Sequence, residues 1–314
     1  MSSPLERCRE IAGFEVLVGA LGYASLADWV ARWAAIDGLS LAREAWPVGV
    51  DFTWMASVGL PLLDQLQQFQ GRSLLGLAAM PGCGKSTLCA WAKAAAASLG
   101  MAVEVVSLDD FYFEGQALDA AMDGNPWRAP RGIPGSHDVE LMLRCLRQWR
   151  SEGSCEAPVF DKALRQGRGD RAGTRLLKAD LLILEGWFVG AGPWAAARHG
   201  EESADLTPLT HAELAYRPVI QRNVLPYQEV WRQLDGLWQL SPTTLSTVTG
   251  WKRQQNLSQQ QQTGSGLAEH ELETMTRSLQ VCIPESALVS GRSADVVLRV
   301  NAQRQVEEVR LAGG

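Results

Sequence analysis

The sequence predicts an α/β fold in which a mostly parallel sheet is flanked by helices. Three short apolar runs, residues 73–80, 102–106 and 179–184, each have the length of a buried strand. Segments of helical character separate these runs, most clearly the Ala-rich stretch 88–100 that directly follows the first run. Strands that alternate with helices pair in parallel and carry helices on both faces of the sheet.

The N-terminal part of the chain has a different pattern from the rest. Residues 1–70 space their apolar side chains as helices do, and we interpret them as a helical extension packed on the core. Residues 71–314 then form the main domain. Within it, residues 124–175 are rich in Gly, Pro and Arg, and they predict ordered loops around one helix at 139–150.

The C-terminal part combines a low-complexity stretch with a strand signal. The Gln-rich residues 254–266 predict a mobile loop. Residues 294–300 and 306–312 alternate apolar and polar side chains and predict a closing pair of strands. We find no internal repeat in the chain.

The composition is that of a globular protein, with 46% hydrophobic and 20% charged residues. The formal net charge of −6 counts against a general nucleic-acid binder, because such proteins are usually basic. The N-terminus has no apolar signal segment and the chain has no run of about 18 apolar residues, so we expect a cytoplasmic protein without membrane partners. The six cysteines are widely spaced and are expected to be free thiols.

The strongest motif is AMPGCGKST, residues 79–87. It matches the phosphate-binding pattern G-x-x-x-x-G-K-[ST], except that Ala79 stands where the first Gly belongs. The glycines let backbone N–H groups converge on phosphate oxygens, and the lysine, one of only five in the chain, reaches the β- and γ-phosphates. We therefore expect ATP to contact Gly82, Cys83, Gly84, Lys85, Ser86 and Thr87.

Carboxylates follow two of the predicted strands at the end that faces the ligand crevice in open α/β sheets. Asp109 and Asp110 follow the second strand, and Asp109 is placed to accept the proton of an acceptor hydroxyl during phosphoryl transfer. Glu185 follows the third strand, where an acid organises Mg²⁺ together with the Ser86 hydroxyl. Lys85 and Asp109 are thus the first catalytic candidates, with Mg²⁺ and ATP as cofactors.

The order of these motifs resembles that of the phosphoribulokinase and uridine kinase group, whose members are α/β P-loop kinases. Two further segments, GNPWRAPRGIPGSHD at 124–138 and PVFDKALRQGRGDR at 158–171, resemble the D-glycerate 3-kinases of plants and cyanobacteria. The resemblance covers about residues 71–300 and is most specific at R-G-x-P-G-[ST]-H-D. It implies a small-molecule kinase that converts D-glycerate to 3-phospho-D-glycerate with ATP, in photorespiratory carbon salvage.

The resemblance also implies roles for residues outside the phosphate loop. Asp109 matches the catalytic Asp of S-x-D-x-F-Y. Lys252 and Arg253 fall in a lid-like segment of about residues 240–270 and are assigned to the nucleotide. The family pattern in this segment is W-R-L-Q-Q-E, whereas this chain reads WKRQQN before a run of glutamines.

An anionic acceptor such as glycerate needs fixed positive donors, and arginine binds a carboxylate with two parallel hydrogen bonds. The segment 124–178 carries 11 basic and 6 acidic residues, which concentrates positive charge there. We expect Arg168 to stabilise charge on the transferring phosphoryl group. The acceptor contacts are assigned to Asp110, Tyr112, Arg128, Arg131, His137, Asp161, Arg165 and Arg171.

Other interpretations of these motifs stay open. A kinase for a nucleoside, pantothenate or a sugar phosphate has the same phosphate loop, and a panel of acceptors separates these activities. A nucleotide-dependent regulatory ATPase is a third hypothesis, although the sequence has no LSGGQ signature and no N-K-x-D motif. Oxidation of Cys83 within the phosphate loop is a hypothesis for regulation.

Overall fold

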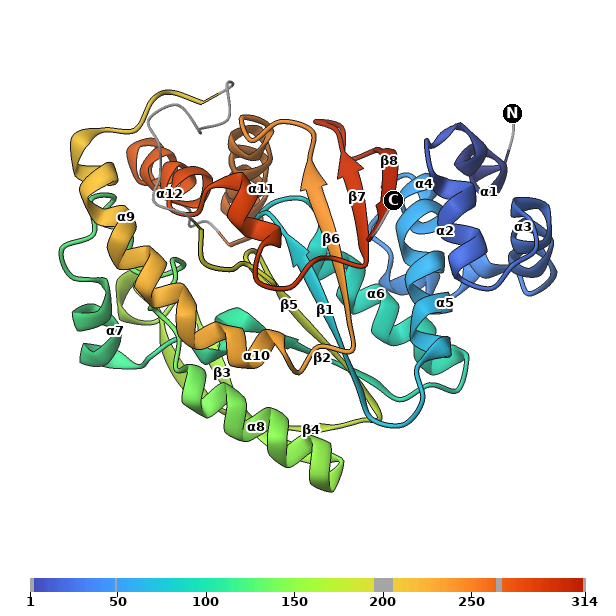
Figure 1. Ribbon diagram of the computed structural model, residues 1–314, viewed down its shortest axis with the longest axis horizontal. Coiled ribbons are helices and arrows are strands. Elements are labelled where there is room, and N and C mark those ends of the chain that lie inside the picture. The colour runs from blue at the N-terminus through green and yellow to red at the C-terminus, as the bar shows by residue number, and fades with distance from the viewer. Residues whose placement is uncertain (1–2, 49, 195–205, 264–266, 313–314) are drawn as a thin grey trace.

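The computed structural model describes residues 3–48, 50–194, 206–263 and 267–312. The strands of its central sheet are β1 Ser73–Ala79, β2 Val103–Ser107, β5 Leu181–Gly186, β6 Gly236–Pro242, β7 Val296–Val300 and β8 Val306–Leu311. Their order across the sheet is β2-β5-β1-β6-β7-β8 (Figure 1). All neighbours run parallel except β8, which is antiparallel to β7.

Helices surround this sheet and precede it in the chain. The N-terminal region contains α1 Pro4–Arg7, α2 Phe14–Ala20, α3 Leu26–Ala35, α4 Phe52–Trp54 and α5 Leu60–Gln68. The later helices are α6 Lys85–Ser98, α7 Gly115–Met122, α8 Val139–Glu152, α9 His211–Val224, α10 Gln228–Trp231, α11 Thr247–Thr263 and α12 Glu269–Val281. Within the described ranges, no helix is long and apolar enough to cross a bilayer.

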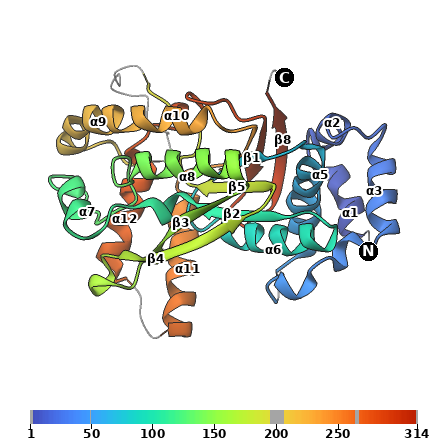
Figure 2. The same cartoon turned by 90° about the horizontal axis from the view of Figure 1, so that it is seen from below.

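The crossover connections decide which face each helix covers. The step from β1 through α6 to β2 leads toward one edge of the sheet, and the step from β2 through α8 to β5 leads back. Because such crossovers are right-handed, two steps in opposite directions place their helices on opposite faces. Figure 2 shows α6 on one face of the sheet and α8 with α10 on the other.

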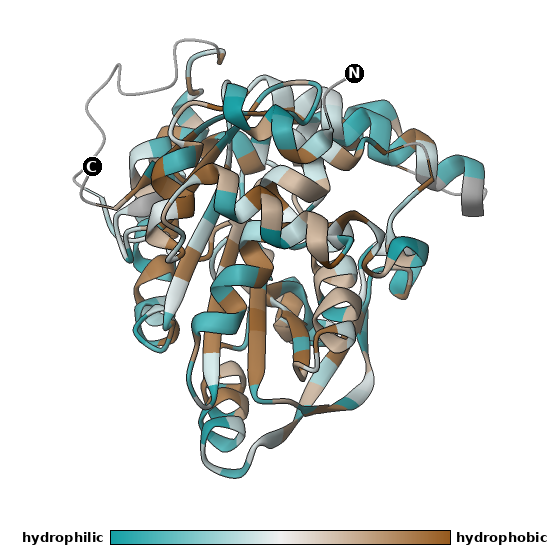
Figure 3. Ribbon diagram, turned by 90° about the vertical axis from the view of Figure 1, so that its right-hand side faces the viewer, coloured by the Kyte–Doolittle hydropathy of each residue, from teal (hydrophilic) through white to brown (hydrophobic). Residues whose placement is uncertain are grey.

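The carboxyl ends of three adjacent strands meet at one edge of the sheet. Strand β1 is buried along its whole length and lies between β5 and β6, and Figure 3 shows apolar residues along the central strands. The phosphate loop follows β1, Asp109 follows β2, and Glu185 lies in β5 beside Leu77 and Ser107. These positions confirm the predicted α/β fold, and they bring the motif residues together at this edge.

The prediction of loops alone around a helix at 139–150 is wrong. Strands β3 Ser154–Asp161 and β4 Asp170–Lys178 form an antiparallel hairpin that is separate from the main sheet. In β4 only Leu177 is buried, so the strand has no apolar run and no alternation from which the sequence could predict it. The hairpin's tip, residues 162–169, lies beside the carboxyl edge of the sheet, because Lys162 there contacts Asp109.

The prediction of a mobile loop at 254–266 is also wrong for the residues that the structure describes. Helix α11 continues to Thr263, and residues 264–266 lie outside the described part of the chain. Glutamine is a good helix former, and a helix with no apolar face gives no periodic signal. The helix is anchored at its start, where Val248 and Trp251 are buried.

The N-terminal helices are joined to the core by backbone hydrogen bonds. Ala12 lies against the outer strand β8, where its N–H donates to Glu307 O and its carbonyl accepts from the Val309 N–H at 2.7 Å. This bridge covers the edge of the sheet. Within the N-terminal region, the buried carboxylate of Asp64 accepts hydrogen bonds from Trp29 and Trp33, at 2.8 and 3.0 Å.

Candidate active site

The phosphate loop between β1 and α6 has the backbone that its glycines allow. Gly82 and Gly84 have φ of 85° and 101°, a region that side chains with a Cβ rarely adopt. A Cβ on Gly82 would also lie 2.7 Å from the Cβ of Trp251, so α11 packs directly against the loop. Helix α6 begins at Lys85, and its N-terminal N–H groups favour an anion at the loop.

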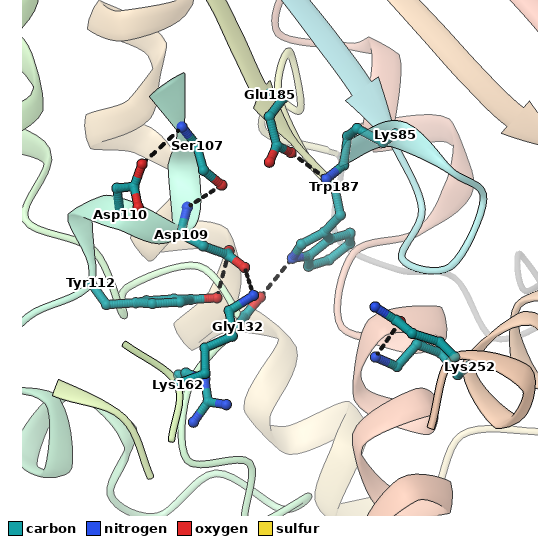
Figure 4. A network of polar contacts seen from close by, with 12 residues as sticks. Lys85, Ser107, Asp109, Asp110, Tyr112, Gly132, Lys162, Glu185, Trp187 and Lys252 are labelled. Carbon is teal, nitrogen blue, oxygen red and sulfur yellow. Dashed lines mark hydrogen bonds and ion pairs between the residues drawn. The ribbon is translucent and has the colours of Figure 1, made fainter. Parts of the chain in front are cut away.

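Lys85 and Glu185 form an ion pair at the base of the site (Figure 4). Burial alone would lower the pKa of Lys85, but the neighbouring Glu185 carboxylate raises it above its usual value. The lysine therefore stays charged. Ser86 is exposed beside this pair, and its hydroxyl and the Glu185 carboxylate both line the same pocket.

Asp109 lies at the centre of the site and Asp110 does not. A short 3₁₀ turn, Leu108–Phe111, follows β2 and turns the two carboxylates in different directions (Figure 4). Asp109 accepts hydrogen bonds from Tyr112 Oη and Lys162 Nζ, both at 2.7 Å. Asp110 instead accepts from the Ser107 N–H at 3.2 Å, which caps the turn.

The surroundings of Asp109 keep it ionised. Burial would raise the pKa of this carboxyl, but the positive charge of Lys162, the hydrogen bond from it and the nearby Lys85 together hold the pKa well below its usual range. Burial raises the pKa of Asp110 above its usual value. The two neighbouring aspartates thus differ in both direction and environment.

A pocket of about 1070 Å³ opens at this edge of the sheet. Nine residues that the sequence assigned to the site line it: Gly82, Gly84, Lys85, Ser86, Thr87, Asp109, Tyr112, Glu185 and Lys252. Its lining also includes Lys162, Trp187 and Arg304, which the sequence did not assign to the site. The scarcity of lysine in the chain was a signal for Lys162, since three of the five lysines line this pocket.

Lys252 reaches the pocket from the first half of α11, opposite Asp109 (Figure 4). Burial, followed by repulsion from Lys162, lowers the pKa of Lys252 to about 8. Its neighbour Arg253 points elsewhere and pairs with Glu269 and Glu273 of α12, at 2.6 and 3.2 Å. Of the two predicted lid residues, only Lys252 lines the pocket.

None of the arginines of 124–175 that were assigned to substrate or to the phosphoryl group is among the described lining residues of the pocket. Arg165 and Arg168 both pair with Asp119 of α7. Arg171 donates to the Tyr112 carbonyl at 3.1 Å and to Asp138 at 3.2 Å. These three arginines hold the β3–β4 hairpin against the segments that precede it.

The remaining predicted acceptor residues also have structural partners or are exposed. Arg131 donates to the carbonyl oxygens of Gly167 and Arg168, both at 2.7 Å, at the hairpin tip. Arg128 is exposed and has a positive φ of 50°. Asp161 is exposed and accepts from the Ala163 N–H at 2.8 Å. Their assignment to the acceptor stays a prediction.

His137 lies behind the site as a support for Tyr112. Its ring stacks on Tyr112 with centroids 4.4 Å apart, and its Nδ1 is 2.7 Å from Tyr227 Oη. Burial lowers the pKa of His137 to about 3, so the ring is neutral at physiological pH. Tyr112 is thereby held where its hydroxyl donates to Asp109.

Cys83 is the buried member of the phosphate loop. Its side chain is 1% exposed, and burial raises the pKa of its thiol to about 11. A thiolate is the reactive form of cysteine, so this environment opposes oxidation. The backbone of the loop, not the thiol, faces the pocket, because Gly82 and Gly84 line it and Cys83 does not.

Comparison with known proteins identifies similar kinases. No family model matches the chain. The chloroplastic D-glycerate 3-kinase of Arabidopsis thaliana is 28% identical over 212 residues, which are 63% of this chain and 44% of that protein. A Schizosaccharomyces pombe protein that carries the provisional name of uridine kinase is 31% identical over 169 residues, 50% of this chain and 70% of its own length.

A solved structure has the same fold as this chain. It is the D-glycerate 3-kinase of Cryptococcus neoformans, with a TM-score of 0.66 at 22% sequence identity. The alignment covers 80% of this chain and 96% of that structure. At this identity the likeness concerns the fold. This chain spans less than half the length of the Arabidopsis relative.

Proposed function

Because this chain belongs to the P-loop kinases of the uridine kinase and D-glycerate 3-kinase type, we propose that it phosphorylates D-glycerate at the 3-hydroxyl with ATP. The observation that carries the proposal is a carboxylate, Asp109, placed between the phosphate loop and two further lysines. Such a pocket offers one anion site for the triphosphate and a second for a small acid.

The phosphate side of the reaction belongs to the loop and to Lys85. The loop N–H groups and the start of α6 bind the β- and γ-phosphates, and Lys85 exchanges its contact with Glu185 for phosphate oxygens. The Ser86 hydroxyl and the Glu185 carboxylate are the oxygen donors that Mg²⁺ prefers, so these residues would hold the ion. When bound, the ion neutralises charge that develops on the phosphate oxygens.

The acceptor side belongs to Asp109 and Lys162. The acceptor oxygen forms a bond to the γ-phosphorus, the bond from that phosphorus to the bridging oxygen of ADP breaks, and the hydroxyl proton passes to Asp109. In the structure Lys162 contacts Asp109 and lowers its proton affinity. A glycerate carboxylate draws Lys162 away, which raises the pKa of Asp109 and makes it a better base when substrate is present.

An acceptor panel tests the proposal. ADP formation is measured with D-glycerate, L-glycerate, uridine, pantothenate and ribulose 5-phosphate, and without acceptor. We expect strong stimulation by D-glycerate, weak activity with the others and little ADP without acceptor. Preference for uridine would replace the proposal with a nucleoside kinase, and an acceptor-independent rate would replace it with a regulatory ATPase.

A further inference from the structure

The pocket continues past the phosphate loop, away from Asp109. On this side it is lined by the N-terminal region and by residues 303–307, which form the end of the β7–β8 turn and the start of β8. We call this part the N-terminal arm, and its N-terminal wall includes Glu10, Ile11, Val50 and Trp54. None of the sequence motifs and none of the steps above uses this arm.

The chemistry of the N-terminal arm differs from that of the acceptor side. Around Asp109 the lining is charged, with Lys162, Lys252 and Lys85. The N-terminal arm instead combines apolar side chains with Glu10 and with the ion pair of Arg7 and Asp51, so its charges are of both signs. Val50 leaves 41% of its surface exposed, although it is a large apolar residue. Apolar walls with a few polar groups suit a flat, hydrogen-bonding ring system.

One hairpin turn fixes the arm to the phosphate loop. Arg304 Nε donates to Gly82 O at 2.9 Å, and three residues later Glu307 O accepts from the Ala12 N–H at 3.3 Å. Three residues span at most about 10 Å, so the wall begins close to the loop. The turn therefore holds the N-terminal wall at a set position relative to any phosphate bound there.

We propose that the N-terminal helical region binds the nucleoside half of ATP, its base and ribose, while the phosphate loop holds the triphosphate. This inference rests on the use of ATP in the proposed function. A triphosphate in the loop directs its terminal phosphate toward Asp109, so the nucleoside must leave on the opposite side. Beyond the phosphate loop the N-terminal arm lines the pocket, which residues of α11 and α12, among them Gln254 and Met275, also line.

Photolabelling of the full-length protein with 8-azido-ATP tests the placement directly. After irradiation and digestion, we expect adducts within residues 7–57, with or without others at 303–307. Excess ATP should suppress them. Adducts only outside residues 7–57 would overturn the proposal.

Calorimetry separates the base from the phosphates. We expect Val50→Asn to weaken ATP binding about three- to tenfold and to leave inorganic tripolyphosphate binding within about twofold, since only apolar contact to the nucleoside is lost. Val16→Asn is the matched control, because Val16 is 63% exposed on α2, away from the pocket, and it should change neither affinity. Equal changes for both ligands, or no change for ATP, would contradict the inference.

These binding measurements do not depend on the acceptor. If D-glycerate is not phosphorylated but the label lies within residues 7–57, the proposed acceptor fails and the nucleoside site stands. If D-glycerate is phosphorylated and the label lies elsewhere, the inference alone fails. If Lys85→Ala leaves ATP binding unchanged, both proposals fail together, because the loop then does not hold the triphosphate.

Discussion

The arginines of the segment 124–175 and the lysines of the pocket are both clusters of positive charge, but they have opposite roles. Arg165, Arg168 and Arg171 are neutralised by three carboxylates of their own fold, Asp119, Asp138 and Asp170. The pocket lysines outnumber the carboxylates that they face. Lys85 pairs with Glu185 and Lys162 with Asp109, while Lys252 contacts only the neutral amide of Gln255 among the described residues.

The difference teaches which positive charge is available to a ligand. An arginine that already has a carboxylate partner gains little from a second one. A buried lysine beside other cations gains from any anion, and burial, followed by repulsion from Lys162, lowers the pKa of Lys252 accordingly. A local excess of basic residues in the sequence therefore does not locate a binding site. The site is located by which basic side chains have carboxylate partners in the folded protein and which do not.

The largest effect is expected at the carboxylate that the lysines surround. Asp109→Asn should lower kcat for D-glycerate by about 10²–10⁴, because the amide cannot accept the hydroxyl proton. Asp110→Asn is the matched control and should keep kcat within about threefold, since Asp110 caps its own turn. Steady-state kinetics of the two variants check this, and equal losses would remove the distinction between the neighbouring aspartates.

The next effect concerns Lys162, which shares the hairpin tip with Arg165 and Arg168 but contacts Asp109 in the pocket. Lys162→Met should raise KM for D-glycerate about ten- to hundredfold and leave KM for ATP unchanged, because a charged hydrogen bond to the acceptor is lost. Since Lys162 lowers the pKa of Asp109, its removal should also move the acidic limb of kcat/KM to higher pH. Lys178→Met, at the end of strand β4, is the control and should change neither quantity.

A shift confined to KM for ATP would place Lys162 on the nucleotide instead. An unmoved acidic limb would mean that Asp109 is not the group that titrates. Both outcomes are visible in the same pH series, so the role of Lys162 is tested apart from the identity of the acceptor.

The contrast also shows what the sequence could predict. The P-loop and the strands β1, β2 and β5 were accessible because a glycine pattern and apolar runs act over a few residues, whereas β6 was not predicted. Lys162 and Asp109 lie 53 residues apart, and Arg165 and Asp119 lie 46 apart, so their pairing depends on how the hairpin folds back. The Gln-rich helix and strand β4 were missed because neither has an apolar periodicity.

Lys252 predicts a dependence of nucleotide affinity on pH. Its pKa is about 8 without ligand, so it is charged below pH 8 and loses its proton as the pH rises. A bound anion restores its usual pKa of about 10.4, so the affinity for ATP should fall about tenfold from pH 7 to pH 9. Lys252→Arg keeps its charge and should flatten this dependence in calorimetric titrations, whereas a retained tenfold fall would assign it to another group.

We expect only a small effect when an arginine of the segment 124–175 is replaced. Arg168 is 53% exposed at its side chain and pairs with Asp119, so Arg168→Ala should keep kcat and KM within about twofold. Asp119→Asn should give the same small change, because it breaks the same pair. If Arg168→Ala instead lowered kcat more than tenfold while Asp119→Asn did not, Arg168 would leave its partner to reach the transferring phosphoryl group, as the sequence predicts.

The smallest effect is expected at Cys83, although it lies in the phosphate loop itself. With a thiol pKa of about 11, only about one molecule in three thousand carries the thiolate at pH 7.5. The buried side chain also gives an oxidant no access. Activity before and after oxidant, followed by dithiothreitol, should therefore be the same for Cys83→Ser and the wild type. Reversible inactivation of the wild type alone would mean that the loop opens to solvent. The loop would then not be held rigidly against Trp251.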